Sequence, residues 1–517
     1  MLKLSRWGIM LLLCILVFDT VPVVASETSQ LDASLRTINR VEDASDLNLI
    51  LPDPQPARRS DASGTTQAQG VNMGRAIAPD PATHVSSPGT PSTSIDTPTA
   101  TSAVQASASR ATSLPNTPVP TATRLTATAT MTANMTPVPT ATVTPVVVPG
   151  MLWGVVSSNG TTNLVAERTA GIEVQVVRFS WKDLEPTEGT FNANAVARWQ
   201  AQLAQLRGAG IGVIAELGFH DPPAWTHAYP NSRYVDQYGD AYDGKGTIDS
   251  GDLNLVFNPQ MRVLAGRYIA QVFATFGTDF AAVRLGGGRW GELTYPPQTY
   301  AGKGNCYWGY DANAQGSNPV SGWRPGAASP GGEAGAFVEW YLNALVGYEG
   351  WQVQAVRGSY TGQLMLLFPS WGVRPGQIQE ATARNLDGTT SAEVNGELQR
   401  GYDFARQVAA ISDPKVIVTT TWLDASTPYE SDPYPQDWTP VKYLASLAQA
   451  HPLHLKLYGE NTGQGSAEAM RYAASQMQRY GLIGMDWYCE TEIFSGQYAT
   501  LSDYQNTIAA YPPAANR

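Results

Sequence analysis

Two glutamates lie in surroundings that suit acid–base chemistry. Glu292 lies in the segment GRWGELTYP (288–296), and Glu460 lies in LKLYGEN (455–461), each just after an apolar stretch. Hydrolysis of a glycosidic bond usually needs two carboxyl groups that flank the bond, one protonated and one ionised. Most glutamates at such places are only exposed loop residues, but the two together favour a two-carboxylate site. We expect Glu292 to be the proton donor and Glu460 the second carboxylate.

Other acidic residues compete for the second role. Glu216 falls within an apolar stretch, where an inward carboxylate would line a pocket. Further candidates follow two later apolar stretches: Asp424, Asp486, Glu490 and Glu492. Glu490 is the strongest alternative, and we also expect it to contact substrate. Glu185 and Glu188 flank a turn with Pro186, so they are expected to shape a loop.

Aromatic side chains recur close to the same stretches. Seven of the eight carry a tryptophan within or shortly past them, and Tyr458 takes the remaining place. Sugar rings present apolar C–H faces that pack on indoles, although a lone tryptophan is more often part of a core. The residues expected to contact substrate are Trp181, Trp225, Trp290, Trp371, Trp422, Trp487 and Tyr458. Trp153 belongs to the same series, whereas Trp199 and Trp340 fall on predicted helices and are expected to pack in the core.

Competing chemistries find little support in the sequence. The chain has no His-Glu-x-x-His or Cys-x-x-Cys motif, and no Gly-x-Ser-x-Gly motif at a strand-to-helix turn. We therefore expect no metal ion and no cofactor. His220 and His227 are expected to line a pocket or to bond the backbone. Cys306 and Cys489 could pair in an oxidising compartment, but the sequence does not place them within bonding distance.

The elements that must position these residues alternate along the chain. Strand-like runs occur near 151–157, 174–179, 211–217, 281–286, 363–368, 416–421, 454–458 and 482–486. Helical periodicity marks 192–210, 260–276, 335–346, 396–411, 440–450 and 466–480. This alternation predicts parallel strands with crossover helices, and eight units close into an α/β fold of the (β/α)8 TIM-barrel type.

In such a barrel, the chemistry is found at the carboxyl ends of the strands. A doubly wound sheet is the structural alternative, but its usual glycine-rich phosphate turn is missing. Gly286, Gly287 and Gly288 follow a strand, yet they lead into Arg289 and Trp290 rather than into a helix start.

The part of the chain before the barrel has a different composition. Lys3 and Arg6 precede an apolar run at 8–18 and small residues near Ala25, which is typical of a secretory signal at 1–25. An uncleaved membrane anchor is the alternative. Residues 26–147 are rich in Ser, Thr and Pro, and TPVPTAT occurs at both 117–123 and 136–142. We expect this segment to be a disordered linker.

Residues 148–517 form the predicted barrel domain. Thirteen of the 14 tryptophans lie at or beyond Trp153, and a net charge of −11 argues against a nucleic-acid partner. A secreted or cell-surface protein that acts on oligo- or polysaccharide is expected, with a possible tether to the cell surface or membrane through the N-terminus.

Several motifs resemble those of known glycoside hydrolases. VRFSW (177–181), followed by LEP (184–186) and GTF (189–191), resembles the second-strand signature of clan A glycoside hydrolases. DPPAW (221–225), DQYG (236–239) and NP (258–259) are similar to segments of family 42 β-galactosidases. The resemblance implies that Glu292 is the acid/base and Glu460 the nucleophile. It further implies that Arg178 helps to hold the nucleophile and contacts substrate, and that Trp487 forms the floor of the sugar site.

One position departs from this pattern. Clan A usually has an Asn before the acid/base, where it bonds the substrate 2-hydroxyl, and here that position is Gly291. The stretch GELTYP (291–296) instead resembles the GELRYP of β-amylases, which invert the anomeric centre. A retaining, β-galactosidase-like hydrolase remains the favoured expectation. The alternatives are an inverting, β-amylase-like glucan hydrolase and a non-catalytic carbohydrate-binding protein on a degenerate barrel.

Overall fold

A computed structural model describes residues 152–158, 160–244 and 252–512. The predicted export signal at 1–25 and the predicted linker at 26–147 lie outside the described residues. Within those residues, no helix is both long and apolar enough to cross a membrane.

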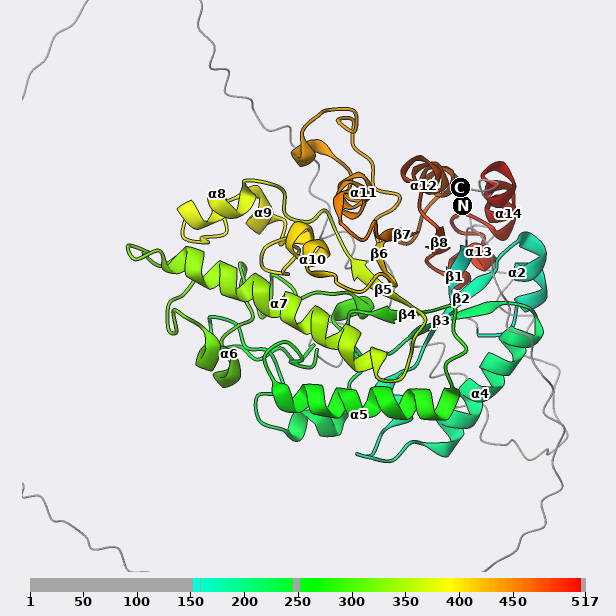
Figure 1. Ribbon diagram of the computed structural model, residues 1–517, viewed down its shortest axis with the longest axis horizontal. Coiled ribbons are helices and arrows are strands. Elements are labelled where there is room, and N and C mark those ends of the chain that lie inside the picture. Colours follow the sequence, from blue (N-terminus) through cyan, green and yellow to red (C-terminus); the bar gives the residue numbers. More distant parts are fainter. Residues whose placement is uncertain (1–151, 159, 245–251, 513–517) are drawn as a thin grey trace, which may run out of the picture. The chain divides into compact units, whose positions relative to one another are not determined.

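Eight parallel strands close into one barrel in the order in which they occur along the chain (Figure 1). They are β1 (Leu152–Val156), β2 (Val174–Arg178), β3 (Gly212–Glu216), β4 (Ala282–Leu285), β5 (Gln363–Phe368), β6 (Val416–Thr420), β7 (Lys456–Glu460) and β8 (Gly484–Trp487). The last strand pairs with the first, and Leu152 lies opposite Gly484. This closure confirms the predicted (β/α)8 TIM barrel.

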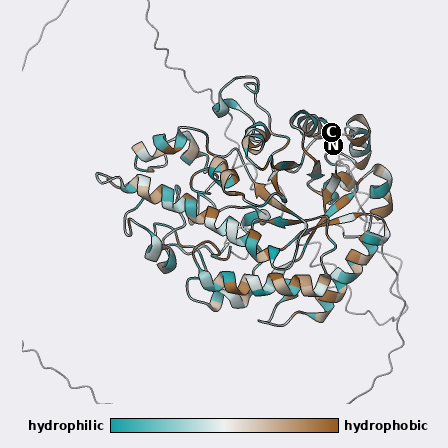
Figure 2. Ribbon diagram, in the orientation of Figure 1, coloured by the Kyte–Doolittle hydropathy of each residue, from teal (hydrophilic) through white to brown (hydrophobic). Residues whose placement is uncertain are grey.

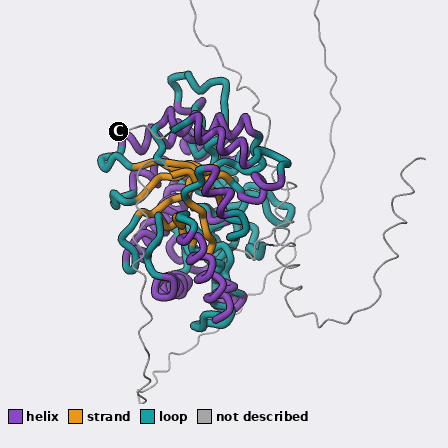
Figure 3. Tube along the Cα trace, turned by 90° about the vertical axis from the view of Figure 1, so that its right-hand side faces the viewer, coloured by secondary structure: helices purple, strands orange, loops and turns teal. Residues whose placement is uncertain are grey.

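Helices surround the strands on the outside of the barrel (Figure 3). They are α2 (Leu164–Ala170), α3 (Trp181–Leu184), α4 (Ala193–Gly208), α5 (Pro259–Phe276), α6 (Ala312–Ser317), α7 (Glu333–Arg357), α8 (Gln377–Ala383), α9 (Ser391–Val394), α10 (Phe404–Ala410), α11 (Pro440–Ala450), α12 (Ala467–Tyr480), α13 (Glu490–Ser495) and α14 (Leu501–Ala510). Short 3-10 helices are η2 (Ala224–Ala228), η3 (Arg289–Gly291) and η4 (Pro435–Asp437).

Apolar residues recur along the strands, and the helices carry both apolar and polar residues (Figure 2). Inside the barrel, a small cluster packs around Val176, Ile214, Met365 and Ile417. A larger cluster fills the layer between strands and helices, because alternate strand residues point outward. Both faces of each strand are therefore buried, as in other parallel sheets.

All eight predicted strands are present, but two helix predictions had wrong bounds. The helix predicted at 335–346 runs from Glu333 to Arg357. The helix predicted at 396–411 begins only at Phe404. Gly396 and Gly401 have φ values of +79° and +82°, which a right-handed helix does not accommodate. The backbone therefore turns twice before α10 starts.

Candidate active site

A pocket opens where the strands end at their carboxyl termini. Eight residues line it: Val156, Arg178, Glu216, Arg284, Trp290, Glu292, Glu460 and Tyr488. It encloses about 310 Å³ of space, open solvent at its mouth included. Both predicted catalytic glutamates therefore face one pocket at the end of the barrel where such folds carry their chemistry.

The turn after β4 positions Glu292. A side chain at Gly286 would collide with the carbonyl oxygen of Gly291, with a Cβ placed 2.0 Å from it, so the turn requires glycine there. Trp290 and Gly291 both have positive φ values, and they reverse the chain so that the Glu292 carboxyl group points into the pocket. The Thr421 hydroxyl at the end of β6 donates to Glu292 Oε1 at 3.1 Å.

Burial raises the pKa of Glu292 to about 7. The Arg400 charge and the Thr421 hydrogen bond oppose this rise, and the nearby Glu460 carboxylate adds to it. The side chain is only 8% exposed. A carboxyl group in this state can keep its proton near neutral pH and can therefore donate it.

Glu460 is the last residue of β7, and Arg284 holds it. Arg284 Nη1 lies 2.9 Å from Glu460 Oε2. Burial raises the pKa of Glu460 above its ordinary value, although the Arg284 charge opposes this rise. The two glutamates thus differ in their partners, because Glu292 accepts from a neutral hydroxyl and Glu460 contacts a guanidinium.

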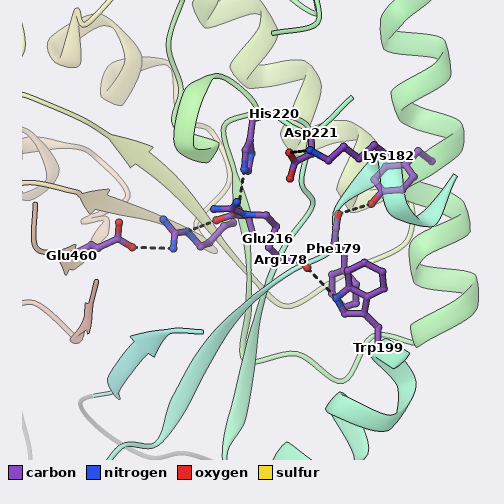
Figure 4. Close-up of polar contacts among 10 residues, drawn as sticks. Arg178, Phe179, Lys182, Trp199, Glu216, His220, Asp221 and Glu460 are labelled. Atoms are coloured by element: carbon purple, nitrogen blue, oxygen red, sulfur yellow. Dashed lines mark hydrogen bonds and ion pairs between the residues drawn. The ribbon is translucent and has the colours of Figure 1, made fainter. Parts of the chain in front are cut away.

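Glu216, at the end of β3, connects two arginines. Arg178 Nε lies 2.8 Å from Glu216 Oε1, and Arg284 Nε lies 3.6 Å from Glu216 Oε2. Although burial opposes it, these two charges and His220 hold the pKa of Glu216 below its ordinary value. His220 lies behind this carboxylate, with its Nε2 3.7 Å from Oε1 (Figure 4). Ion pairs therefore run from Arg178 through Glu216 and Arg284 to Glu460.

The resemblance to clan A gave Arg178 the task of holding Glu460. In the structure, Arg178 contacts Glu216, its charge also lowers the pKa of Glu460, and Arg284 lies in direct contact with Glu460. Arg178 still lines the pocket, where it can reach a substrate. Sequence reasoning missed Arg284, although an arginine between Val283 and Leu285 in a buried strand was a usable signal.

Gly291 packs directly against Glu216. A Cβ at position 291 would lie 3.1–3.3 Å from the three carboxyl atoms of Glu216. The carboxylate of Glu216 therefore occupies space that a larger residue at position 291 would need.

Most of the predicted aromatic contacts belong to the core. Trp181, Trp487 and Tyr458 are at most 1% exposed. Trp181 stacks on Tyr268 with ring centroids 4.9 Å apart, and the Tyr458 hydroxyl donates to Asp486 at 2.8 Å. Trp153 is buried as well. These side chains are buried and are not among the residues that line the pocket, so their predicted substrate contacts gain no support from the structure.

The aromatic walls of the pocket are Trp290 and Tyr488. Trp487 and Tyr488 are neighbours, and they point in opposite directions because side chains alternate at the end of β8. Trp487, the predicted floor of the sugar site, therefore does not line the pocket, whereas its neighbour Tyr488 does. Three of the predicted contacts are partly exposed but are not among the residues that line the pocket: Trp225, Trp371 and Trp422.

Glu490 is also turned away from the pocket. It is fully buried at the start of α13, where its carboxyl group accepts from the Ser158 backbone N–H at 3.0 Å and from Asn163 at 3.3 Å. Asp424 and Glu492 bond the backbone of Thr462 and Gln464. These three carboxyl groups hold loops together, and the predicted substrate contact of Glu490 gains no support because the residue does not line the pocket.

The structure leaves Cys306 and Cys489 unbonded to each other. Cys306 is buried, and burial raises the pKa of its thiol to about 12. Across the described ranges, no group of three or more His, Cys, Asp or Glu side chains is arranged to hold a metal ion.

No family model matches the chain, and no curated protein matches it. Among solved structures, it is similar to the catalytic domain of a β-amylase from Paenibacillus polymyxa, with a TM-score of 0.53 and 15% identity over 70% of this chain and 98% of that chain. A β-galactosidase from the psychrophilic Marinomonas ef1 has a TM-score of 0.45 and 13% identity over 66% of this chain and 54% of that chain. A family 1 β-glucosidase from Thermotoga maritima has a TM-score of 0.39 and 10% identity over 71% and 98%.

These neighbours are glycoside hydrolases of the TIM-barrel clan. At such low identity the first similarity shows a shared fold, and the other two similarities are too weak to add to it.

Proposed function

We propose that this protein is a glycoside hydrolase that cleaves O-glycosidic bonds with Glu292 and Glu460. The observation that carries the proposal is a pocket at the carboxyl ends of the strands that holds two differently partnered glutamates. One has a pKa raised to about 7, and the other lies 2.9 Å from a guanidinium. Burial raises the pKa of both carboxyl groups, so their different partners, a hydroxyl for Glu292 and a guanidinium for Glu460, are what support separate acid and base roles.

In the proposed reaction, Glu292 donates its proton to the oxygen of the leaving group as the bond to the anomeric carbon breaks. Glu460 attacks the anomeric carbon and forms a glycosyl ester. Water then attacks this ester, Glu292 accepts the proton of that water, and the sugar is released with retained configuration. Trp290 and Tyr488 offer faces on which the apolar side of a sugar ring can pack.

An inverting reaction is the second candidate, and Gly291 favours it. The residue that retaining members of the resembled clan place before the acid/base is missing, and Glu216 occupies its space. The similarity to a β-amylase catalytic domain covers 98% of that domain. In this candidate, Glu460 removes a proton from a water molecule that attacks the anomeric carbon directly, and the substrate is a glucan.

We further propose that the protein is secreted or held at the cell surface. The basic residues and apolar run within 1–25 support export, and the Ser/Thr/Pro-rich segment at 26–147 supports a tethered catalytic domain. N-terminal sequencing of the protein recovered from the medium or the cell surface tests this proposal. Recovery of the protein in the cytoplasm alone would contradict it.

The test is hydrolysis of a panel of aryl glycosides, β-galactosides and α-glucans by the full chain beside Glu292→Gln and Glu460→Gln. Loss of activity in both variants by about 100-fold or more supports the proposal. Proton NMR of the first product separates retention from inversion. Sugar binding without hydrolysis of any substrate would instead support a non-catalytic carbohydrate-binding protein.

A further inference from the structure

Arg284 is a buried cation that lies between the pocket carboxylates of Glu216 and Glu460. Its side chain, from β4, is 3% exposed and lies 2.9 Å from Glu460 Oε2 and 3.6 Å from Glu216 Oε2. Its two acidic partners come from β3 and β7, and Arg178 of β2 contacts the first of them, Glu216 (Figure 4). A buried guanidinium is costly unless charged partners compensate for the loss of water, and here two carboxylates do so.

Charged groups from five places surround Glu460. Arg178 comes from β2, Glu216 from β3, Arg284 from β4, Glu292 from the turn after β4, and Asp486 from β8. Among these groups, Arg284 is the cation that contacts the carboxylate directly. The two flexible bonds beyond Cβ that set the direction of the Glu460 carboxylate are therefore restrained by an ion pair from across the barrel.

We propose that Arg284 is a positioning residue that fixes the orientation of the Glu460 carboxylate and keeps it charged for catalysis, while Glu216 holds and partly neutralises the same guanidinium. This inference rests on the proposed function, and it assigns to β4 a task that the sequence resemblance gave to Arg178 on β2.

The packing around position 284 does not require a charged side chain. Arg284 pairs in register with Met365 on one side and with Glu216 on the other, and its strand neighbours Val283 and Leu285 are buried apolar residues. An apolar side chain could fill such a position, and buried ion pairs often contribute no more stability than apolar residues of similar volume. The ion pair to a pocket carboxylate is what distinguishes arginine here.

Arg284 and Glu216 have opposite effects on the pKa of Glu460, so removing either charge should shift that pKa in opposite directions. The Arg284 charge lowers the pKa of Glu460, and the Glu216 charge raises it. Removing the Arg284 charge should therefore raise that pKa and move the acidic limb of kcat/KM to higher pH. Removing the Glu216 charge should move the same limb to lower pH.

The experiment compares pH profiles of kcat/KM for the full chain, using the substrate that the wild type hydrolyses. Arg284→Gln should lose about 100-fold in kcat/KM through misplacement of Glu460. Its acidic limb should move up by about one pH unit or more. Arg284→Lys should return the limb towards its original place, and Glu216→Gln should move it down.

Arg400→Gln is the matched control. Arg400 is a buried arginine whose charge lowers the pKa of Glu292, so its loss should move the basic limb to higher pH and leave the acidic limb in place. An unmoved acidic limb in Arg284→Gln, or an upward shift in Glu216→Gln, would overturn the inference. If circular dichroism shows that Arg284→Gln does not fold, the inference is tested by the direction in which the acidic limb of kcat/KM moves in Glu216→Gln.

A wild type that hydrolyses no substrate would defeat the proposed function, and the effect of Arg284 on Glu460 could still be tested separately. The titration of Glu460 can then be followed directly by carbon-13 NMR of protein labelled at the glutamate carboxyl groups, with Glu460→Gln to identify its signal. A midpoint that rises in Arg284→Lys by less than in Arg284→Gln supports the positioning role. A midpoint unchanged in both variants overturns it.

Discussion

At the scale of single residues, burial and partner decide what each glutamate can do. Glu292 and Glu460 are equally buried, at 8% exposure, yet one accepts from the Thr421 hydroxyl and the other contacts the Arg284 guanidinium. Burial raises the pKa of both carboxyl groups, and at Glu460 the direct contact with a cation opposes part of that rise. In the proposed reaction, the same residue type therefore serves as a proton donor in one place and as a carboxylate in the other.

Glu292→Gln should remove a pH-dependent loss of stability. The pKa of Glu292 is raised from 4.5 to about 7, so between these values the folded state holds a proton that the unfolded state releases. The contribution of the Glu292 proton to the free energy of unfolding is fully present below the unfolded pKa of 4.5. It is lost as pH rises through the folded pKa of about 7. Relative to wild type, the glutamine variant should gain on the order of 3 kcal/mol between pH 4 and pH 8 in urea unfolding.

Glu468→Gln, on an exposed position of α12, is the control and should show no such gain. A Glu292→Gln variant that differs from wild type by the same free energy at both pH values would contradict the raised pKa.

Gly291→Asn should impair rather than improve activity. Gly291 has a φ of +79°, which Asn tolerates, but its Cβ would lie 3.1–3.3 Å from the Glu216 carboxyl atoms. The crowding should displace Glu216 and, through Arg284, Glu460. We expect kcat/KM to fall about tenfold or more, since misplacement of about 1 Å can cost 100-fold.

Gly302→Asn controls for backbone strain in this experiment. Its φ is +76°, and no atom lies within 4 Å of a Cβ built there. Equal activity losses in the two variants would show that crowding against Glu216 is not the cause.

At the scale of elements, the end of a strand decides which side chains enter the pocket. The apolar runs and their lengths made the strands predictable, whereas α2 and α14 were missed because they bury few residues. Side chains alternate along β8, so Trp487 points to the helices and Tyr488 points to the pocket. An error of one residue in reading the strand end exchanges a core residue for a residue that lines the pocket.

Tyr488→Ala and Trp487→Ala should therefore fail in different ways. Trp487 is fully buried beside Tyr504, and its loss should cost about 3–5 kcal/mol of unfolding free energy. Tyr488 lines the pocket, so its loss should raise KM or lower kcat, with a stability change below about 1 kcal/mol. Thermal unfolding and steady-state kinetics of both variants check this; a large loss of stability in Tyr488→Ala would place that residue in the core.

At the scale of the whole molecule, the pocket exists only when the barrel is closed. β1 pairs with β8, and these two ends of the barrel supply Val156 and Tyr488 to the pocket. α14 covers this seam from outside, because the Tyr504 hydroxyl donates to the Gly154 carbonyl at 2.7 Å and its ring meets Trp153 edge-on at 6.0 Å. Stability of the seam and integrity of the pocket are therefore coupled.

Tyr504→Ala should weaken the whole barrel. Loss of a fully buried aromatic ring should cost about 3–5 kcal/mol, and activity should disappear at the same lowered temperature at which the fold is lost. Tyr504→Phe removes only the hydrogen bond and should cost about 1 kcal/mol. Matched thermal unfolding and inactivation curves test this, and an unchanged melting temperature in Tyr504→Ala would show that the seam does not depend on α14.

The sequence alone determined the barrel and the two glutamates. Apolar runs alternating with helical periods specify eight strands, and residues that follow such runs must gather at one end of the barrel because parallel strands end together. Glu292 and Glu460 could be chosen on that ground, and both line the pocket.

Only the tertiary structure decided which groups face those glutamates. Arg284 meets Glu460 across the barrel, and Glu490 turns to the Ser158 backbone, although each pair is far apart in the chain. Beyond the last paired residue of a strand, the backbone angles of the turn, as at Trp290 and Gly291, set the direction of each side chain. Local periodicity does not encode those angles or the contacts across the barrel, so the partners that set each pKa emerge only when the chain is folded.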